Sequence, residues 1–246
     1  MKILVIGMGQ CGARIADEFS RQNIRAKHQR GLEIVNDVFA VSTDTSDLID
    51  LISIKPDYSH RILIGAKQLK GEGVAGDNKL GAQVMQEHAD PVIEDIRRTK
   101  QFFDTDAILV TAGAAGGIGS GALPVMVQRL KQRFKDKVVY AMVILPYKHE
   151  EQEEARTVRN TAICLKSTAS VADAVFLTDN QHYYKDDMEK GNYADINQAI
   201  VEPFYNLLCA GAVKQKKHIG AKILDAGDII QTLGGWTVIG SGRVFV

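Results

Sequence analysis

The sequence predicts an α/β protein: a doubly wound, mostly parallel β-sheet with helices on both faces. Strand-sized apolar runs alternate with helical stretches along the chain, and this alternation is typical of a parallel sheet. The run 138–145 is long and apolar, as strands in the middle of such a sheet are. Ligands of these sheets bind at the carboxyl ends of the strands. Because glycine-rich loops follow two of the apolar runs, we expect one ligand site at that edge.

Composition excludes several classes of protein. The 246 residues suit one large domain, and an apolar content of 45% allows a sizeable core. Thirty basic residues balance thirty acidic ones, so no nucleic acid partner is expected. The longest apolar runs are strand-sized and the N-terminal run is too short for a signal peptide, so we expect no membrane insertion. Three scattered cysteines suggest a reducing, cytoplasmic location.

Two prolines affect the expected helices. Asp90-Pro91 has the pattern of a fresh N-cap and first turn, so the helix that starts near Lys79 is expected to break and restart there. Pro203 is expected to kink a long helix that starts near Ala194. Strands are expected over residues 2–6, 38–41, 61–64, 108–110, 138–145 and 174–177.

The central stretch 106–128 carries the strongest functional signal. A buried strand runs into TAGAAGGIGSG (111–121), and a helix is expected from about Gly119. Glycines allow the backbone to bend sharply and approach a ligand, while backbone N–H groups and a helix N-terminus attract anions, above all phosphate. A plain turn would usually need one or two glycines, so the sequence favours a phosphate-binding loop.

A second glycine motif leaves an alternative open. Gly7, Gly9 and Gly12 follow a strand with the spacing of the dinucleotide fingerprint. That fingerprint expects an acidic residue at the end of the second strand, roughly 20 residues further on. The first acid after this strand is Asp44, which lies well beyond that distance. The missing acidic residue weakens the interpretation as an NAD-dependent oxidoreductase but does not exclude it.

Six segments, in order, resemble the tubulin/FtsZ superfamily, and their spelling is most similar to its archaeal CetZ group. They are GQCG (9–12), VAGDN (74–78), AAGGIGSG (114–121), TDN (178–180), YADINQAIV (193–201) and LDAGDII (224–230). The resemblance covers the whole chain. It implies a cytoskeletal protein that binds GTP or GDP with Mg²⁺.

The resemblance also assigns a binding site. Asn180 and Asn197 would read guanine, because an amide offers both a donor and an acceptor, and Tyr193 would stack on the base. Pro146 and Glu150 match the ribose-contacting loop in spacing. The remaining positions assigned to the nucleotide are Gly9, Gln10, Cys11, Asp44, Ala75, Gly76, Asp77, Asn78, Gly113, Ala115, Gly116, Gly117, Ile118, Gly119 and Ser120.

Catalysis, by the same resemblance, is phosphoryl transfer to water. Such a reaction needs charge stabilisation and a positioned water more than covalent chemistry. Asp225 and Asp228 would belong to the opposite end of the subunit and complete the active site of the next subunit in a head-to-tail polymer. A simpler interpretation of Asp228 is a helix N-cap, and the two roles can coexist.

Three departures from the family pattern concern hydrolysis. Ile118 replaces a threonine of the glycine signature, Ala115 replaces its first glycine, and Ile223 stands where FtsZ usually has asparagine. A structural or regulatory relative that binds GTP but hardly hydrolyses it is the alternative. Arg156 lies two positions from the arginine of the FtsZ pattern, so no role is transferred to it.

The resemblance suggests three parts of the chain: a GTPase domain over 1–192, a core helix over 193–218 and a C-terminal part over 219–246. The last part would hold the acidic loop, a short helix and the first strand of a second domain. We expect the rest of that domain to be absent or truncated. Its apolar strand would then pack on the core helix or pair with another chain.

Overall fold

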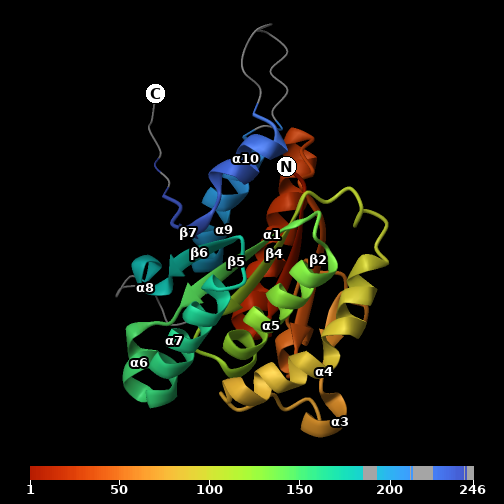
Figure 1. Ribbon diagram of the computed structural model, residues 1–246. Helices are drawn as coiled ribbons and strands as arrows, with labels where there is room; N and C mark the ends of the chain where they lie inside the picture. The colour runs from red at the N-terminus through yellow and green to blue at the C-terminus, as the bar shows by residue number, and fades with distance from the viewer. Residues whose placement is uncertain (185–192, 211, 213–223, 241, 243–246) are drawn as a thin grey trace, which may run out of the picture.

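The computed structural model describes residues 1–184, 193–210, 212, 224–240 and 242 (Figure 1). The elements in chain order are β1 (Ile3–Met8), α1 (Gly9–Arg30), β2 (Val35–Ser42), α2 (Ser46–Ile49), β3 (Arg61–Leu63), α3 (Ala66–Leu69), α4 (Asn78–Arg97), β4 (Ala107–Gly113), α5 (Gly117–Arg133), β5 (Val138–Leu145), α6 (Lys148–Glu153), α7 (Ala155–Ala169), β6 (Ala174–Asp179), α8 (Asn180–Tyr183), α9 (Tyr193–Cys209), α10 (Ala226–Thr232) and β7 (Gly235–Thr237). No helix in these described ranges is both long and apolar enough to cross a membrane.

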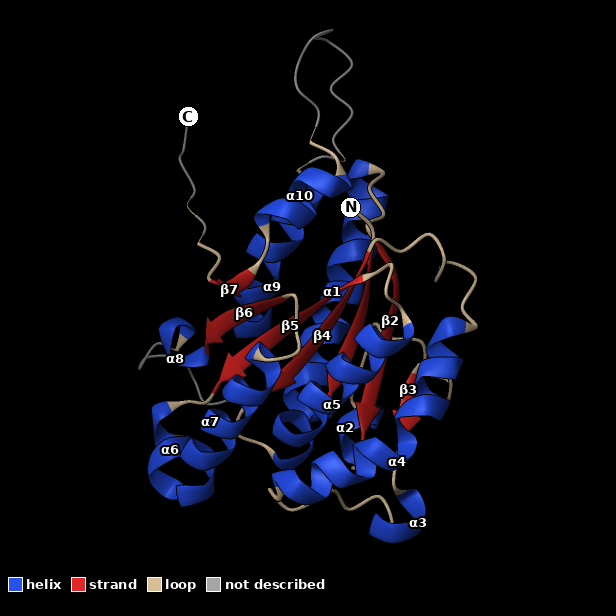
Figure 2. Cartoon of the chain, viewed as in Figure 1, coloured by secondary structure: helices blue, strands red, loops and turns tan. Residues whose placement is uncertain are grey.

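One parallel sheet organises the fold. Its strands lie in the order β3-β2-β1-β4-β5-β6-β7, and each neighbouring pair is parallel. The arrowheads in Figure 2 accordingly point towards one edge. The chain winds outward in both directions from the β1–β4 pair, which makes this pair the switch point where ligands of such sheets bind. The predicted doubly wound α/β fold is confirmed.

Two apolar layers cover the two faces of the sheet. Alternate residues of β1 show this, because Ile3 and Val5 pack on one side while Leu4 and Ile6 pack on the other. Helices α1 and α9 cover the first face, where Phe19 and Phe204 meet edge to face with ring centroids 5.8 Å apart. Helices α4, α5 and α7 cover the second face. Both faces are therefore buried, which explains why the strands are apolar throughout.

The predicted break at Asp90-Pro91 is wrong. Helix α4 continues from Asn78 to Arg97 with Pro91 inside it. Proline removes one helical N–H, but Val92, Ile93 and Ile96 are buried beyond it. Burial of this apolar face stabilises the helix more than the missing hydrogen bond costs, since tertiary packing supplies most helical stability.

The C-terminal apolar segment joins the main sheet. Strand β7 pairs in parallel with β6, so this strand does not lack a sheet as predicted. The register pairs Ala174 with Gly235, and Gly235 N donates to the Asp173 carbonyl oxygen at 3.0 Å just before β6. The long helix starts at Tyr193 as expected and ends at Cys209, while most of the predicted extension to residue 218 lies outside the described residues.

Candidate functional site

A cavity of about 500 Å³ opens at the carboxyl ends of the strands. This volume is typical of small-molecule sites. All but three of the predicted nucleotide-binding positions line the cavity; the exceptions are Asp77, Asn78 and Ser120. Lining residues that were not among the predicted binding positions are Met8, Arg14, Thr43, Asp47, Glu72, Gly73, Val74, Ala114, Ile144, Leu145, Tyr147 and His149.

Two helices begin in the lining of this cavity. Helix α1 starts at Gly9 directly after β1, and α5 starts at Gly117 directly after the loop that follows β4. Because β1 and β4 are neighbours, the two helix N-termini lie side by side. Their unpaired N–H groups and dipoles favour an anion at this end of the cavity.

Close packing explains the glycines of both loops. Gly9 has a φ of +66°, and a Cβ there would lie 2.7 Å from Ile118 Cγ2. A Cβ at Gly119 would lie 2.6 Å from the Gly113 carbonyl oxygen. Ile118 is buried in the apolar layer of α4 and α5, so this departure from the family signature packs the two loops together. Ser120, in contrast, donates its hydroxyl to the Gly116 carbonyl inside the first turn of α5.

A third loop, residues 71–77, closes the same end of the cavity. Gly76 and the non-glycine Ala75 both have positive φ, at +76° and +47°. Asp77 caps α4 by accepting hydrogen bonds from Lys79 N at 2.9 Å and Leu80 N at 3.1 Å. This cap directs the Asp77 carboxylate to the helix rather than to the cavity.

Side chains from α7 hold this loop in place. Arg156 Nη1 donates to the Ala75 carbonyl oxygen at 3.0 Å. Asn160 Nδ2 donates to the carbonyl oxygens of Gly76 at 3.0 Å and Ala115 at 2.8 Å. No local sequence signal marks these partners, because each lies more than 80 residues along the chain from the carbonyl of the loop 71–77 that it holds.

Polar and acidic side chains line the cavity after β2. The Thr43 hydroxyl is fully buried and has no hydrogen-bond partner in the described part of the chain. Asp44 Oδ1 accepts from Ser46 N at 2.8 Å. Burial raises the pKa of Asp47, whose Oδ2 accepts a hydrogen bond from Ser42 at 2.6 Å. An unpaired buried hydroxyl normally has a ligand or water as its partner.

The residues after β2 fit a magnesium ion only in part. Carboxylate oxygens are the ligands that Mg²⁺ prefers, and Asp44, Asp47 and Glu72 all line the cavity. Within the described ranges, however, no group of three acidic, histidine or cysteine side chains could hold a metal ion by itself. Magnesium would therefore depend on phosphate oxygens and water for most of its ligands.

The other end of the cavity is aromatic. Tyr147 belongs to the loop after β5, and its ring centroid lies 6.5 Å from that of Tyr193 at the start of α9 and 5.3 Å from that of His149. Burial raises the pKa of Tyr147 to about 12, so its hydroxyl is a neutral hydrogen-bond donor. Asn180 and Asn197 line this end from α8 and α9. A flat ring with polar edges would find both stacking and amide partners here.

Asp225 and Asp228 lie away from the cavity. Helix α10 immediately precedes β7, and because β7 is parallel to β6 the helix sits at the amino end of the sheet (Figure 1). Asp225 is the N-cap, with Oδ1 accepting from Asp228 N at 2.9 Å, and Asp228 Oδ2 accepts from Asp225 N at 3.2 Å. The two form a capping box, so Asp228 is not itself the N-cap. Ile223 lies outside the described residues.

The sheet order defines a doubly wound α/β protein with a cavity at the switch point of its sheet. Residues 2–186 match the family model described as the tubulin/FtsZ family, GTPase domain. The chain belongs to this family.

Its similar relatives are CetZ proteins. The chain is 34% identical to the tubulin-like protein CetZ1 of Haloferax volcanii over 96% of its own length and 57% of the relative's. It is 32% identical to the CetZ protein of Pyrococcus horikoshii, over 99% and 62%. The chain thus spans about three fifths of the length of these relatives.

Two solved structures share the fold. The GDP-bound CetZ1 monomer from Haloferax volcanii superposes with a TM-score of 0.82 at 33% identity, covering 96% of this chain and 66% of that one. The GTPγS-bound CetZ2 protofilament from the same organism gives 0.81 at 32% identity, covering 97% and 64%.

The expectation that the second domain is lacking is wrong. Residues 185–244 match the model described as tubulin-like CetZ, C-terminal domain. The apolar strand β7 lies within this range and, as described above, pairs with β6. Sequence reasoning treated the segment as unpartnered because its pairing with a distant strand leaves no local signal.

Proposed function

We propose that this protein binds GTP and GDP in the cavity at the carboxyl ends of its strands. The observation that carries the proposal is the meeting of two helix N-termini and three backbone loops at one end of a single cavity, with two asparagines and a tyrosine at the other. The nucleotide-bound states of the CetZ1 and CetZ2 structures support it. Phosphates would lie at the first end and guanine at the second.

Hydrolysis would be completed by the next subunit. The cavity contains backbone donors for phosphate, while Asp225 and Asp228 lie at the amino end of the sheet. In a head-to-tail polymer the amino end of one subunit faces the cavity of another, where the two carboxylates would orient the attacking water. One oxygen of each carboxylate serves the helix cap, and a carboxylate has two. Mg²⁺ would neutralise phosphate charge.

Assembly into protofilaments follows from the same geometry. A contact between opposite ends of identical subunits does not close, so it extends into a filament. The protofilament form of CetZ2 supports this proposal. We also propose that the protein is located in the cytoplasm and that its assembly partners are further copies of the same chain.

Slow hydrolysis is the second candidate. The residue at position 118 is an isoleucine whose side chain packs against the other glycine loop, so the family's threonine hydroxyl is missing from the phosphate end. A protein of this kind would bind GTP and respond to it without rapid turnover.

Identifying the nucleotide that the purified protein carries tests the binding proposal. We expect a guanine nucleotide, and titrations of GTP, GDP, ATP and NAD side by side should show preference for the first two. A preference for NAD would refute the proposal. Turnover per subunit measured at rising protein concentration then separates the two candidates, because catalysis completed by a neighbour must speed up as subunits meet.

A further inference from the structure

One buried side chain joins two of the loops that line the cavity. Asn160 of α7 is 3% exposed, and its single amide nitrogen donates to the Gly76 carbonyl oxygen at 3.0 Å and to the Ala115 carbonyl oxygen at 2.8 Å. The acceptors belong to the loop 71–77 and to the glycine loop after β4. Both amide protons of Asn160 are therefore used.

The two loops differ in their other attachments. The glycine loop continues β4 directly into α5, and Ala114 N donates to the Ile144 carbonyl oxygen of β5 at 2.9 Å. The first half of the loop 71–77 is held by the segment after β2, through Thr45 N to the Gly71 carbonyl oxygen at 3.0 Å and Gly73 N to the Thr43 carbonyl oxygen at 3.2 Å. Its second half contains Ala75 at a φ of +47°. A non-glycine residue in this left-handed region costs about 1 kcal/mol or more, so the surrounding contacts must hold it there.

The contacts from α7 also fix the direction of one N–H group. Arg156, one helical turn before Asn160, holds the Ala75 carbonyl at 3.0 Å. The Ala75–Gly76 peptide is trans, so its N–H points away from its carbonyl and therefore away from this donor. Gly76 lines the cavity. Asn160 holds the carbonyl of the next peptide, Gly76–Asp77, so the peptides on both sides of the Gly76 Cα are held.

We propose that Asn160 is a positioning residue that ties the loop 71–77 to the glycine loop and thereby sets how tightly the site holds the terminal phosphate of GTP. This inference rests on the proposed nucleotide function. In the proposed binding mode the diphosphate common to GTP and GDP would lie against the glycine loop, which is also attached to β5 through Ala114. The loop 71–77 closes the phosphate end of the cavity, so the third phosphate is the group that would reach it, and loss of Asn160 should affect GTP more than GDP.

The test compares the full chain with Asn160→Ala and Asn160→Asp. Aspartate keeps the shape but replaces the donor by a carboxylate that both carbonyls repel. Arg159→Ala is the matched control, because Arg159 is exposed on the same helix one residue earlier. Competition binding against a fluorescent guanine nucleotide gives Kd values for GTPγS and GDP. Amide hydrogen exchange at residues 73–77, measured without nucleotide, reports the loop directly.

We expect GTPγS to bind about tenfold more weakly to both Asn160 variants, the value for loss of one to two hydrogen bonds to buried acceptors, with GDP changed less than about twofold. Exchange at 73–77 should rise at least tenfold while β4 and α5 stay protected, and Arg159→Ala should match the wild type. Equal loss of both nucleotides together with a lower Tm would reduce Asn160 to a structural role and overturn the proposal. Unchanged exchange would overturn it whether or not the variants bind nucleotide.

Failure of the proposed function gives a different result. In that case the wild-type chain shows no preference for guanine nucleotides in the binding assay, and the proposed role of Asn160 in holding a terminal phosphate is refuted as well. The exchange experiment still decides whether Asn160 holds the loop. If neither variant folds, Asn160→Ser, which removes the reach to both carbonyls without introducing a charge, supplies both measurements.

Discussion

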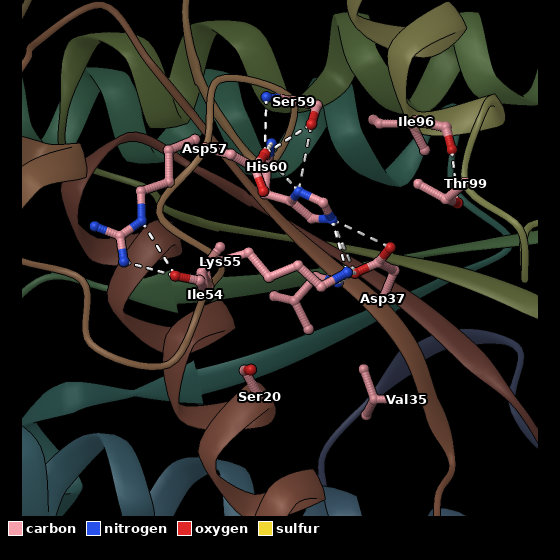
Figure 3. A network of polar contacts seen from close by, with 12 residues as sticks. Ser20, Val35, Asp37, Ile54, Lys55, Asp57, Ser59, His60, Ile96 and Thr99 are labelled. Atoms are coloured by element: carbon pink, nitrogen blue, oxygen red, sulfur yellow. Dashed lines mark hydrogen bonds and ion pairs between the residues drawn. The ribbon is translucent and has the colours of Figure 1, made fainter.

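The polar side chains near the two ends of strand β2 differ in whether they have hydrogen-bond partners. Near its amino end, Asp37 belongs to a network in which His60 lies 2.7 Å from Asp57 through Nδ1 and 3.0 Å from Lys55 through Nε2 (Figure 3). The His60 ring stacks on Phe39 at 5.1 Å. Just beyond its carboxyl end, the Thr43 hydroxyl is buried with no partner among the described residues.

This difference distinguishes polar groups that stabilise the fold from polar groups that are available to a ligand. A buried polar group that has its partners stabilises the loop in which it lies, whereas one without partners costs free energy unless a ligand supplies them. Thr111 and Tyr140 also have unpaired buried oxygens, but neither lines the cavity. The comparison therefore singles out Thr43, and it predicts that substitutions at the two ends affect different measurements.

The largest effect is expected for Asp225 and Asp228 of α10. These two residues hydrogen-bond to each other in the capping box, and we propose that they also take part in catalysis. Asp228→Asn keeps a side-chain acceptor for the cap but removes the charge, so Tm should change little. We expect turnover in assembled protein to fall about a hundredfold, the scale of losing a general base, with GTP affinity unchanged. Steady-state hydrolysis at high protein concentration measures this. Unchanged turnover would remove Asp228 from the mechanism.

Two neighbouring glycines give a matched pair. A Cβ at Gly117 would lie 2.8 Å from Asp77 N, whereas nothing in the protein lies within 4 Å of a Cβ at Gly116. We expect Gly117→Ala to lower the free energy of unfolding by about 1–3 kcal/mol through overpacking. Gly116→Ala should leave stability intact but weaken nucleotide binding, because it fills the space proposed for phosphate. Denaturant unfolding and nucleotide titration of both variants check this pair, and equal stability would contradict it.

Thr43→Val tests the carboxyl end of β2. Valine has nearly the same shape, and the lost hydroxyl has no partner among the described residues, so unfolding stability should stay equal or rise. GTP affinity should fall by up to about tenfold, the value of one neutral hydrogen bond. Loss of stability without loss of affinity would show that the hydroxyl serves the fold.

Asp57→Asn tests the polar network near the amino end of β2. Burial raises the pKa of Asp57, but hydrogen bonds from Ser59 and His60 outweigh it and lower the pKa to about 2. The folded-state pKa lies below the unfolded value, so the stabilisation is complete above about pH 4 and is lost as the pH falls towards 2. Its side chain is 48% exposed, which limits the contribution to about 1 kcal/mol. Unfolding at pH 7 should show this loss, the difference should vanish near pH 2, and nucleotide affinity should not change.

The sequence predicted those features that local pattern determines. Alternating apolar runs gave the sheet, and Val138–Leu145 coincides with β5 as predicted. The glycine loops and both asparagines reach one cavity because parallel strands end at one edge. Chain order and strand direction were enough to predict the sheet and the shared edge of the glycine loops, whereas the two asparagines were assigned by the resemblance to the tubulin/FtsZ superfamily.

Long-range partners explain what local pattern missed. Asn160 and Arg156 hold carbonyls more than 80 residues away, and nothing in their own helix indicates this. Pro91 looked like a break because the burial of Val92 and Ile93 beyond it depends on the tertiary fold. Arg14 lines the cavity from within α1, past the motif that marks the start of that helix.

The late position of β7 in the chain has a consequence for protein synthesis. Strand β6 ends at Asp179, and the strand that covers its edge starts only at Gly235, after α9 and α10 have been made. A nascent chain leaving the ribosome therefore carries an unprotected β6 edge while these helices are translated. Such an edge is a template for the β7 segment of another copy, so crowded polysomes favour strand exchange between chains. Rapid docking of α9 onto α1 would shorten this exposed period.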